Sequence, residues 1–311
     1  MNFPLSTNPL FPVIRSVRRR AFSLIEVMVV VGLMSVIILG LVMMFGQTQR
    51  AYKLGMTQVD TLESGRIVTD IMTRELSQMT PSYVSNGVNF YAQLALGAPG
   101  GFTFSRQELP GSPLPGRTNL LEELFFVTKT NQTWLGIGYV VLTNRPNTAV
   151  WERPWAGVGT LYRFSGTATS GQNPAGLFSS YLYTTPFTNL SRILDNVVHF
   201  KVRAYDPDGK WITTTNQFAT NRFGAVINAV VREPGVASYA FGESEYYLLT
   251  TNAVPASVEL ELGILEERAA ERARSISDPV AREKFLAQQA GKVHLFRWRV
   301  PVRNVDPTAY Q

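Results

Sequence analysis

The chain of 311 residues contains no cysteine and only two histidines, His199 and His294. Without cysteine there are no disulfide bonds, no thiolate catalysis and no cysteine metal sites, and a periplasmic location is compatible with this. Both histidines fall in predicted strands with no paired acid or cysteine motif beside them in sequence, so we interpret them as packing residues. Phosphate loops, Gly-x-Ser-x-Gly elbows and His-Glu-x-x-His motifs are also missing. We therefore predict a protein that is not an enzyme and that uses no metal or cofactor.

Charge is sparse and unevenly placed. Charged residues make up 17% of the chain and apolar residues 45%, which is typical of a globular protein with a membrane segment. The net charge is +6, but residues 1–21 hold four arginines and no acid. The basic character is therefore local, and it does not indicate a nucleic-acid partner. By the positive-inside rule it places residues 1–21 in the cytoplasm and the C-terminal part outside.

A long uncharged apolar run follows this basic cluster. Val27–Phe45 comprises 19 residues without a charge. As a helix it is roughly 28 Å long, enough to cross a bilayer core. Glu26 stands just inside its entrance, where a carboxylate is unfavourable for a simple anchor. The arginines before the run are Arg15, Arg18, Arg19 and Arg20.

The junction between the basic cluster and the apolar run has a dense motif. It reads Ala21-Phe22-Ser23-Leu24-Ile25-Glu26-Val27. The small residue precedes the apolar run, whereas an ordinary secretory signal has its small residues after the run. The motif resembles the type IV prepilin signal, whose usual form is Gly-Phe-[Thr/Ser]-Leu-[Leu/Ile]-Glu-Val. Ala21 stands where that family normally has Gly, and the leader of 21 residues is long for the family.

This resemblance implies processing and assembly. A prepilin peptidase would cut between Ala21 and Phe22 and methylate the new amine of Phe22. Glu26 would then neutralise the amine of a neighbouring subunit, and pairing offsets the cost of burying either charge alone. The implied partners are the peptidase, other pilins or pseudopilins, the inner-membrane assembly platform and the lipid bilayer. The alternative interpretation is an uncleaved membrane anchor.

Residues 22–79 read as one long helix. Its first part is apolar all round, and about 24–45 is the expected transmembrane segment. Its second part places apolar residues such as Val68, Met72 and Leu76 at steps of three and four. Pro81 ends the pattern. Because this apolar stripe must be buried, we predict an α+β fold in which the helix packs on a mainly antiparallel sheet, as in pilins, with residues 80–311 forming an extracytoplasmic β-rich domain.

The remaining elements are predicted from residue patterns. Residues 82–120 are rich in Gly, Pro, Asn and Ser and read as a long loop. Alternating or β-branched segments predict strands at 124–128, 136–143, 160–165, 181–185, 197–205, 211–215, 246–250, 257–262 and 293–302. Lys129–Leu135 is expected as a hairpin loop. Two helices are expected at 265–274 and 280–290, the second capped by Asp278.

Within 197–205 the alternation predicts two faces. One face holds Val198, Phe200, Val202 and Ala204, and the other holds Val197, His199, Lys201, Arg203 and Tyr205.

The strand order carries a second resemblance. Ile137-Gly138-Tyr139-Val140-Val141 precedes Leu161-Tyr162-Arg163. Leu194–Val202 leads into Asp206-Pro207-Asp208-Gly209-Lys210-Trp211, and Pro255–Leu260 follows. This order is similar to that of the J-type minor pseudopilins of type II secretion and the W-type minor pilins. It implies a minor subunit near the tip of a pseudopilus or type IV pilus.

Two further patterns are short clusters of charged or aromatic residues. Asp206-x-Asp208-Gly209 lacks the later oxygen ligands of a calcium loop and is interpreted as a turn. Trp151–Trp155 places two tryptophans around charges, typical of a buried anchor or a contact with a partner or glycan. The rival function is a single-span extracytoplasmic sensor or binding protein, which retention of residues 1–21 favours.

Overall fold

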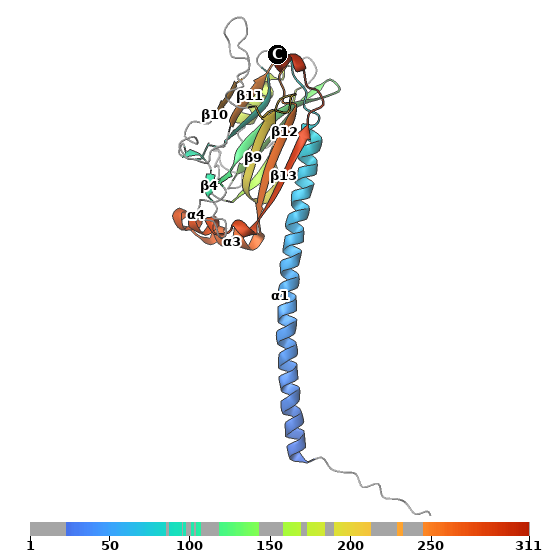
Figure 1. Ribbon diagram of the computed structural model, residues 1–311, viewed down its shortest axis with the longest axis vertical. Coiled ribbons are helices and arrows are strands. Elements are labelled where there is room, and N and C mark those ends of the chain that lie inside the picture. The colour runs from blue at the N-terminus through green and yellow to red at the C-terminus, as the bar shows by residue number, and fades with distance from the viewer. Residues whose placement is uncertain are drawn as a thin grey trace, which may run out of the picture. The chain divides into compact units, whose positions relative to one another are not determined.

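The computed structural model describes residues 23–84, 87–94, 96–97, 101–102, 104–106, 118–142, 158–168, 173–183, 190–212, 229–232 and 245–310. The chain divides into two compact units, Met1–Gly55 and Met56–Gln311. The described part of the first unit is a single stretch of helix. The second unit contains the sheet (Figure 1).

The first element is α1, Leu24–Leu76, a helix of 53 residues. The sequence predicted this helix at 22–79. No proline interrupts it, and the amide of Met79 still donates to the carbonyl of Leu76 at its end. Between Leu24 and Tyr52 its large apolar side chains are exposed. From Met56 onward one stripe of the helix is buried against the sheet.

The second unit is built on a nine-stranded sheet in the order β10-β11-β1-β6-β7-β8-β9-β12-β13. All of its pairings between strands are antiparallel, as predicted. The strands are β1 (Val88–Leu94), β6 (Glu122–Thr130), β7 (Thr133–Leu142), β8 (Gly159–Ala168), β9 (Leu190–Tyr205), β10 (Ala229–Arg232), β11 (Glu245–Thr250), β12 (Ser257–Leu265) and β13 (Val293–Pro301).

Smaller elements complete the described chain. Two short ribbons pair β2 (Leu96–Gly97) with β3 (Gly101–Phe102), and β4 (Phe104–Arg106) with β5 (Thr118–Leu120). The helices are α2 (Ala175–Tyr183), α3 (Glu267–Ser275) and α4 (Pro279–Ala287), with 3-10 turns η1 (Ala290–Lys292) and η2 (Pro307–Tyr310).

The two faces of the sheet carry different layers because strand side chains alternate. One face forms the main core with Val68, Met72 and Leu76 of α1. The opposite face is covered by α2, whose Leu177 and Tyr181 are buried against β6 and β8. Farther along, α3 and α4 enclose a third cluster and lie together at one end of β12 and β13 (Figure 1). The fold is therefore α+β, a long helix on an antiparallel sheet.

Two predictions about loops and strands are wrong. The segment 82–120 contains β1, which pairs with β6 and β11 and buries Phe90 and Ala92 in the main core. The glycines and asparagines on either side of β1 favour a loop by composition. The strand forms because β6 and β11 pair with it on both sides. The segment predicted as a strand at 181–185 ends α2, and 184–185 lie outside the described residues. Asn173 caps that helix by accepting from the amide of Ala175.

The turn between β6 and β7 is tighter than the predicted loop at 129–135. Thr130 pairs with Thr133, and Asn131 takes a φ of 56°. A two-residue hairpin turn favours such a positive φ, which Asn tolerates. The predicted return strand at 211–215 is described only at Trp211 and Ile212, where the amide of Ile212 donates to the carbonyl of Ala204. Trp211 forms only an isolated bridge with Tyr205, and 213–215 lie outside the described residues.

The faces of β9 differ from the simple alternation. Gly263 pairs with His199 while Ile264 pairs with Val197, so Val198 is an extra residue in β9. Val197 therefore points into the main core with Phe200, and Val198 packs instead against α3. The predicted turn at 206–209 is present, with Gly209 at φ +78°.

Candidate functional site

The predicted processing site lies at the start of α1. Arg18, Arg19, Arg20, Ala21 and Phe22 lie outside the described residues. The described chain begins at Ser23, whose carbonyl accepts from the amides of Glu26 and Val27. Glu26 is the acidic residue of the first turn and is exposed. A carboxylate at this position also favours helix formation, because it lies near the positive end of the helix dipole.

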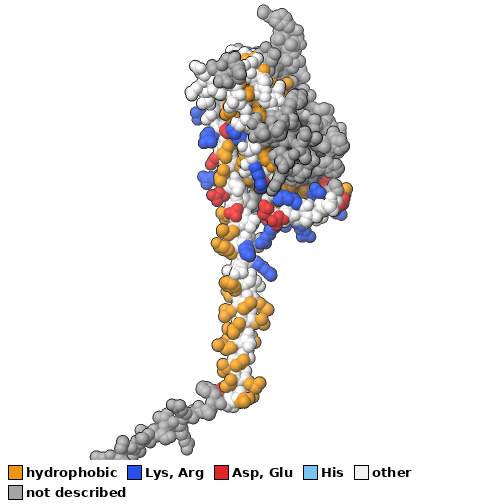
Figure 2. Space-filling view, turned by 180° about the vertical axis from the view of Figure 1, so that it is seen from behind, with side chains coloured by type: hydrophobic (Ala, Val, Ile, Leu, Met, Phe, Trp, Pro, Cys, Tyr) orange, Lys and Arg blue, Asp and Glu red, His pale blue; other side chains and the backbone are white. Residues whose placement is uncertain are grey.

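The helix that follows Glu26 exposes an apolar surface along its length. The large hydrophobic side chains from Leu24 to Phe45 are each between 51% and 78% exposed. Figure 2 shows them along α1. The helix is long and apolar enough to cross a membrane, and none of its most apolar window is buried. An apolar surface of this extent needs lipid or other subunits around it.

Comparison with known proteins bears on this segment. Residues 17–42 match the family model described as a prokaryotic N-terminal methylation motif. The chain carries a prepilin-type N-terminal methylation motif. The match covers Arg18, Arg19 and Arg20, the Ala21–Phe22 junction and Glu26. It supports a type IV pilin-like protein, and it implies processing by a prepilin peptidase and assembly with other pilins. Curated proteins gave no significant match to the chain.

A second polar site joins α1 to the sheet. Glu75 lies on the buried side of α1, between the fully buried Met72 and Leu76. Its Oε1 lies 2.8 Å from a terminal nitrogen of Arg163 on β8, and its Oε2 accepts from the hydroxyl of Tyr139 on β7 at 2.5 Å. Burial and the Glu75 carboxylate raise the pKa of Tyr139 well above its ordinary value. This group, Glu75, Tyr139 and Arg163, is called the helix clasp below.

The sequence alone does not predict the helix clasp. Tyr139 and Arg163 belong to the two strands that carry the J-type resemblance, and they are directly opposite each other in the β7–β8 register. Glu75 was visible only as one of several charges in α1. The feature that could have indicated the clasp is the position of the Glu75 carboxylate among residues of the buried stripe, because an unpaired charge there is costly. The clasp can therefore fix the position of Glu75, and with it this turn of α1, on the sheet.

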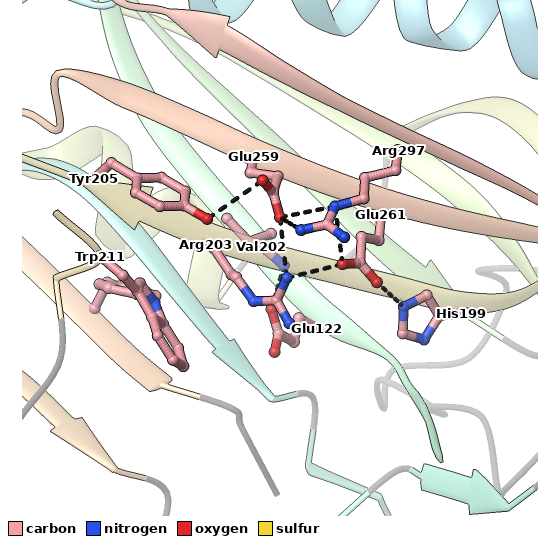
Figure 3. Close-up of polar contacts among 10 residues, drawn as sticks. Glu122, His199, Val202, Arg203, Tyr205, Trp211, Glu259, Glu261 and Arg297 are labelled. Carbon is pink, nitrogen blue, oxygen red and sulfur yellow. Dashed lines mark hydrogen bonds and ion pairs between the residues drawn. The ribbon is translucent and has the colours of Figure 1, made fainter. Parts of the chain in front are cut away.

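A third polar cluster lies on the face of the sheet opposite α1 (Figure 3). Arg203 on β9 contacts Glu259 at 3.0 Å and Glu261 at 2.9 Å, both on β12. Arg297 on β13 contacts Glu259 at 2.7 Å. The Nε2 of His199 lies 3.4 Å from Glu261. The hydrogen bond from His199 and the charge of Arg203 overcome burial and lower the pKa of Glu261 to about 2.

The ion pairs of this cluster link the adjacent strands β9, β12 and β13. Each carboxylate faces an arginine, so the charges balance within three adjacent strands. His199 is buried, and its Nδ1 accepts from the amide of Leu120, which ties β5 to the sheet. In the described ranges no group of three or more His, Cys, Asp or Glu residues could hold a metal ion. The Asp206 carboxylate accepts from the amide of Lys210 within its turn.

His294 and Trp151–Trp155 are the remaining features that the sequence singled out. The Nε2 of His294 lies 3.5 Å from Glu266, next to α3. Trp151–Trp155 lies outside the described residues. Neither therefore adds to the processing site, the helix clasp or the cluster of Figure 3.

Proposed function

We propose that the chain is a minor pilin or minor pseudopilin, a structural subunit of a type IV pilus or of a type II secretion pseudopilus. The observation that carries the proposal is the methylation motif at 17–42 immediately before an apolar helix with an exposed acid at its start. The antiparallel sheet packed on the second part of α1 supports it, because a filament subunit needs a helical stem joined to a folded domain.

The precursor is anchored in the inner membrane by α1. Residues 1–21 are the cytoplasmic leader, 22–79 the helical stem and 80–311 the extracytoplasmic domain. The peptidase cuts between Ala21 and Phe22 and methylates the amine of Phe22. The apolar segment is kept, and the subunit then leaves the bilayer through the assembly platform to join a filament near its tip.

Glu26 acts in this assembly as a charge partner. It lies four residues after Phe22, which is about one helical turn. A carboxylate and an amine are both costly in an apolar filament core, and each offsets the cost of the other when they pair. In the proposed filament Glu26 of one subunit receives the amine of Phe22 of its neighbour.

The deciding experiment is the intact mass and N-terminal sequence of the full chain recovered from its native membranes. The proposal expects a chain that begins at methylated Phe22 and that co-sediments with sheared filaments. A chain still beginning at Met1 in every fraction would refute the proposal. It would instead favour a single-span sensor or binding protein.

A further inference from the structure

The strand β13 is the last strand of the nine-stranded sheet, and among the described residues its one neighbouring strand is β12. It pairs with β12 over nine residues without a bulge. The amide of Glu266 donates to the carbonyl of Lys292, and the amide of Val302 donates to that of Ala256. In an antiparallel pair such bonds recur at every second residue. The even-numbered residues of β13 therefore bond to β12, and the backbone groups of Val293, Leu295, Arg297 and Arg299 point away from it.

This outer side is accessible. In the described part of the chain, β13 pairs with no strand other than β12. Leu295 is 45% exposed and the side chain of Arg297 is 57% exposed. The opposite edge of the sheet, β10, has only four residues. Edge strands are commonly kept short because their free backbone groups pair with other chains, so a regular nine-residue edge calls for an explanation.

The open edge is basic. From Gly291 to Val305 the sequence contains no acid, and the four exposed cations along it are Lys292, Arg297, Arg299 and Arg303. Glu259 and Glu261 neutralise Arg297 from β12. The Nε of Arg299 instead donates to the hydroxyl of Ser257. Its guanidinium carbon lies 3.7 Å from the ring centre of Tyr205. Across the described residues no carboxylate pairs with Lys292, Arg299 or Arg303.

The charge pattern disfavours pairing between two copies of this chain. Two β13 strands that pair antiparallel about their central residue bring Arg297 of one copy against Arg297 of the other. Like charges directly opposite each other destabilise a strand pair. The favoured occupant is instead a strand whose acids complement Lys292, Arg299 and Arg303, the cations along this edge that no described carboxylate neutralises.

We propose that β13 is a strand-addition site for an extended, acidic segment of a partner protein. Its backbone bonds to the outward groups of Val293, Leu295, Arg297 and Arg299. In this arrangement the bound segment places a carboxylate opposite Arg299, which has no carboxylate partner among the described residues, and an apolar side chain opposite Leu295. The backbone bonds supply affinity, and the alternating side chains supply specificity. The inference goes beyond the proposed function, which requires only the helix and its processed end.

The test is photo-crosslinking in the native cells, using the full chain with p-benzoylphenylalanine at position 295. The control carries the crosslinker at Val280 on α4, which is 72% exposed and distant in sequence. We expect a specific adduct from position 295 that mass spectrometry maps to an acidic segment of a partner protein. An adduct only with lipid, with β13 of a second copy or with a segment lacking acids would overturn the proposal, as would no adduct.

A charge variant separates recognition from folding. Arg299→Glu should lower the yield of the 295 adduct about tenfold, which corresponds to about 1.4 kcal/mol. Arg299→Lys keeps the charge and should keep the adduct. Since Arg299 has no carboxylate partner among the described residues, its replacement leaves no acid unpaired there. An adduct that survives Arg299→Glu unchanged would contradict the proposal.

A backbone measurement completes the test. Amide exchange resolved to single residues should be fast at Leu295 and Arg297 in the free chain and slow in the complex. If those amides exchange equally fast in both, the partner does not add a strand. Filament sedimentation and N-terminal analysis of the same cells test the proposed function independently. A chain that is processed and incorporated but gives no adduct refutes only this inference.

Discussion

Arg163 on β8 and Glu75 on α1 form an ion pair of 2.8 Å across 88 residues of sequence, with side chains only 21% and 14% exposed. Tyr139 donates to the same carboxylate from β7. The pair therefore joins the helix that carries the processing motif to the middle of the sheet. Because both charges are largely removed from water, each depends on the other for its stability.

Removing one member of the clasp should destabilise the second unit strongly. Arg163→Leu leaves the Glu75 carboxylate without its cation, and we expect a loss of about 3 kcal/mol in the free energy of unfolding. The double variant Glu75→Leu/Arg163→Leu should recover part of that loss, since it leaves no unpaired charge. Urea unfolding of the full chain in detergent measures both. Equal stability of the wild type and Arg163→Leu would show that the pair contributes nothing.

Gly65 should tolerate no side chain, whereas Gly55 should. A Cβ added at Gly65 would lie 2.3 Å from the ring of Phe296 on β13, so the ring or the helix must move. We expect Gly65→Ala to cost about 1–3 kcal/mol through this overlap. A Cβ at Gly55 meets no described atom within 4 Å, so Gly55→Ala should stabilise α1 by up to about 1 kcal/mol. Thermal unfolding of the two variants side by side checks the opposite signs.

The stability of the cluster in Figure 3 should fall in acid. The pKa of Glu261 is lowered from 4.5 to about 2 in the folded protein, so the unfolded chain binds the proton more readily. Its contribution is full above about pH 4.5 and is lost as the pH falls toward 2. Glu261→Gln should therefore lower the melting temperature at pH 6, and the difference from wild type should shrink by pH 3. A difference that grows on acidification would contradict this assignment.

The parts of this molecule that the sequence predicted are those with local patterns. The apolar run and the stripe with Val68 and Met72 sufficed for α1, and β-branched alternation sufficed for most strands. The motif from Ala21 to Glu26 is likewise contiguous in sequence. These features depend on neighbours within about ten residues, which a single chain displays directly.

The parts that the sequence did not predict depend on distant partners. β1 is a strand because β6 and β11 flank it, and its own composition reads as a loop. The extra residue Val198 follows from the register with β12, and Asn196, whose φ is 60°, lies where the register with β8 shifts. Glu75 and Arg163 each show in sequence as ordinary charges. Only the packing of α1 on the sheet brings them together.

The junction residue Ala21 should slow processing compared with glycine. The resemblance to prepilin signals puts a glycine at this position, and Gly lacks the Cβ that a tightly fitting cleavage site must accommodate. Ala21→Gly should therefore raise the fraction of processed chain in a pulse-chase experiment. Ala21→Leu is the matched control in the opposite direction and should leave the leader attached. Equal cleavage of all three chains would show that this position is not the recognised junction.

Glu26 should be dispensable for cleavage and required for assembly. In the proposed function, cleavage acts on a precursor in the membrane at Ala21 and Phe22, whereas the Phe22 amine needs a counter-charge only once subunits pack together. Glu26→Ala should therefore give a chain that still begins at methylated Phe22 but is depleted from sheared filaments. Glu26→Gln keeps the size and removes the charge, so it should behave like Glu26→Ala if charge is what matters. Glu26→Asp keeps the charge on a side chain one methylene shorter and should restore part of the incorporation. Normal filaments from Glu26→Ala would exclude the pairing with the Phe22 amine, whatever the N-terminus of the chain.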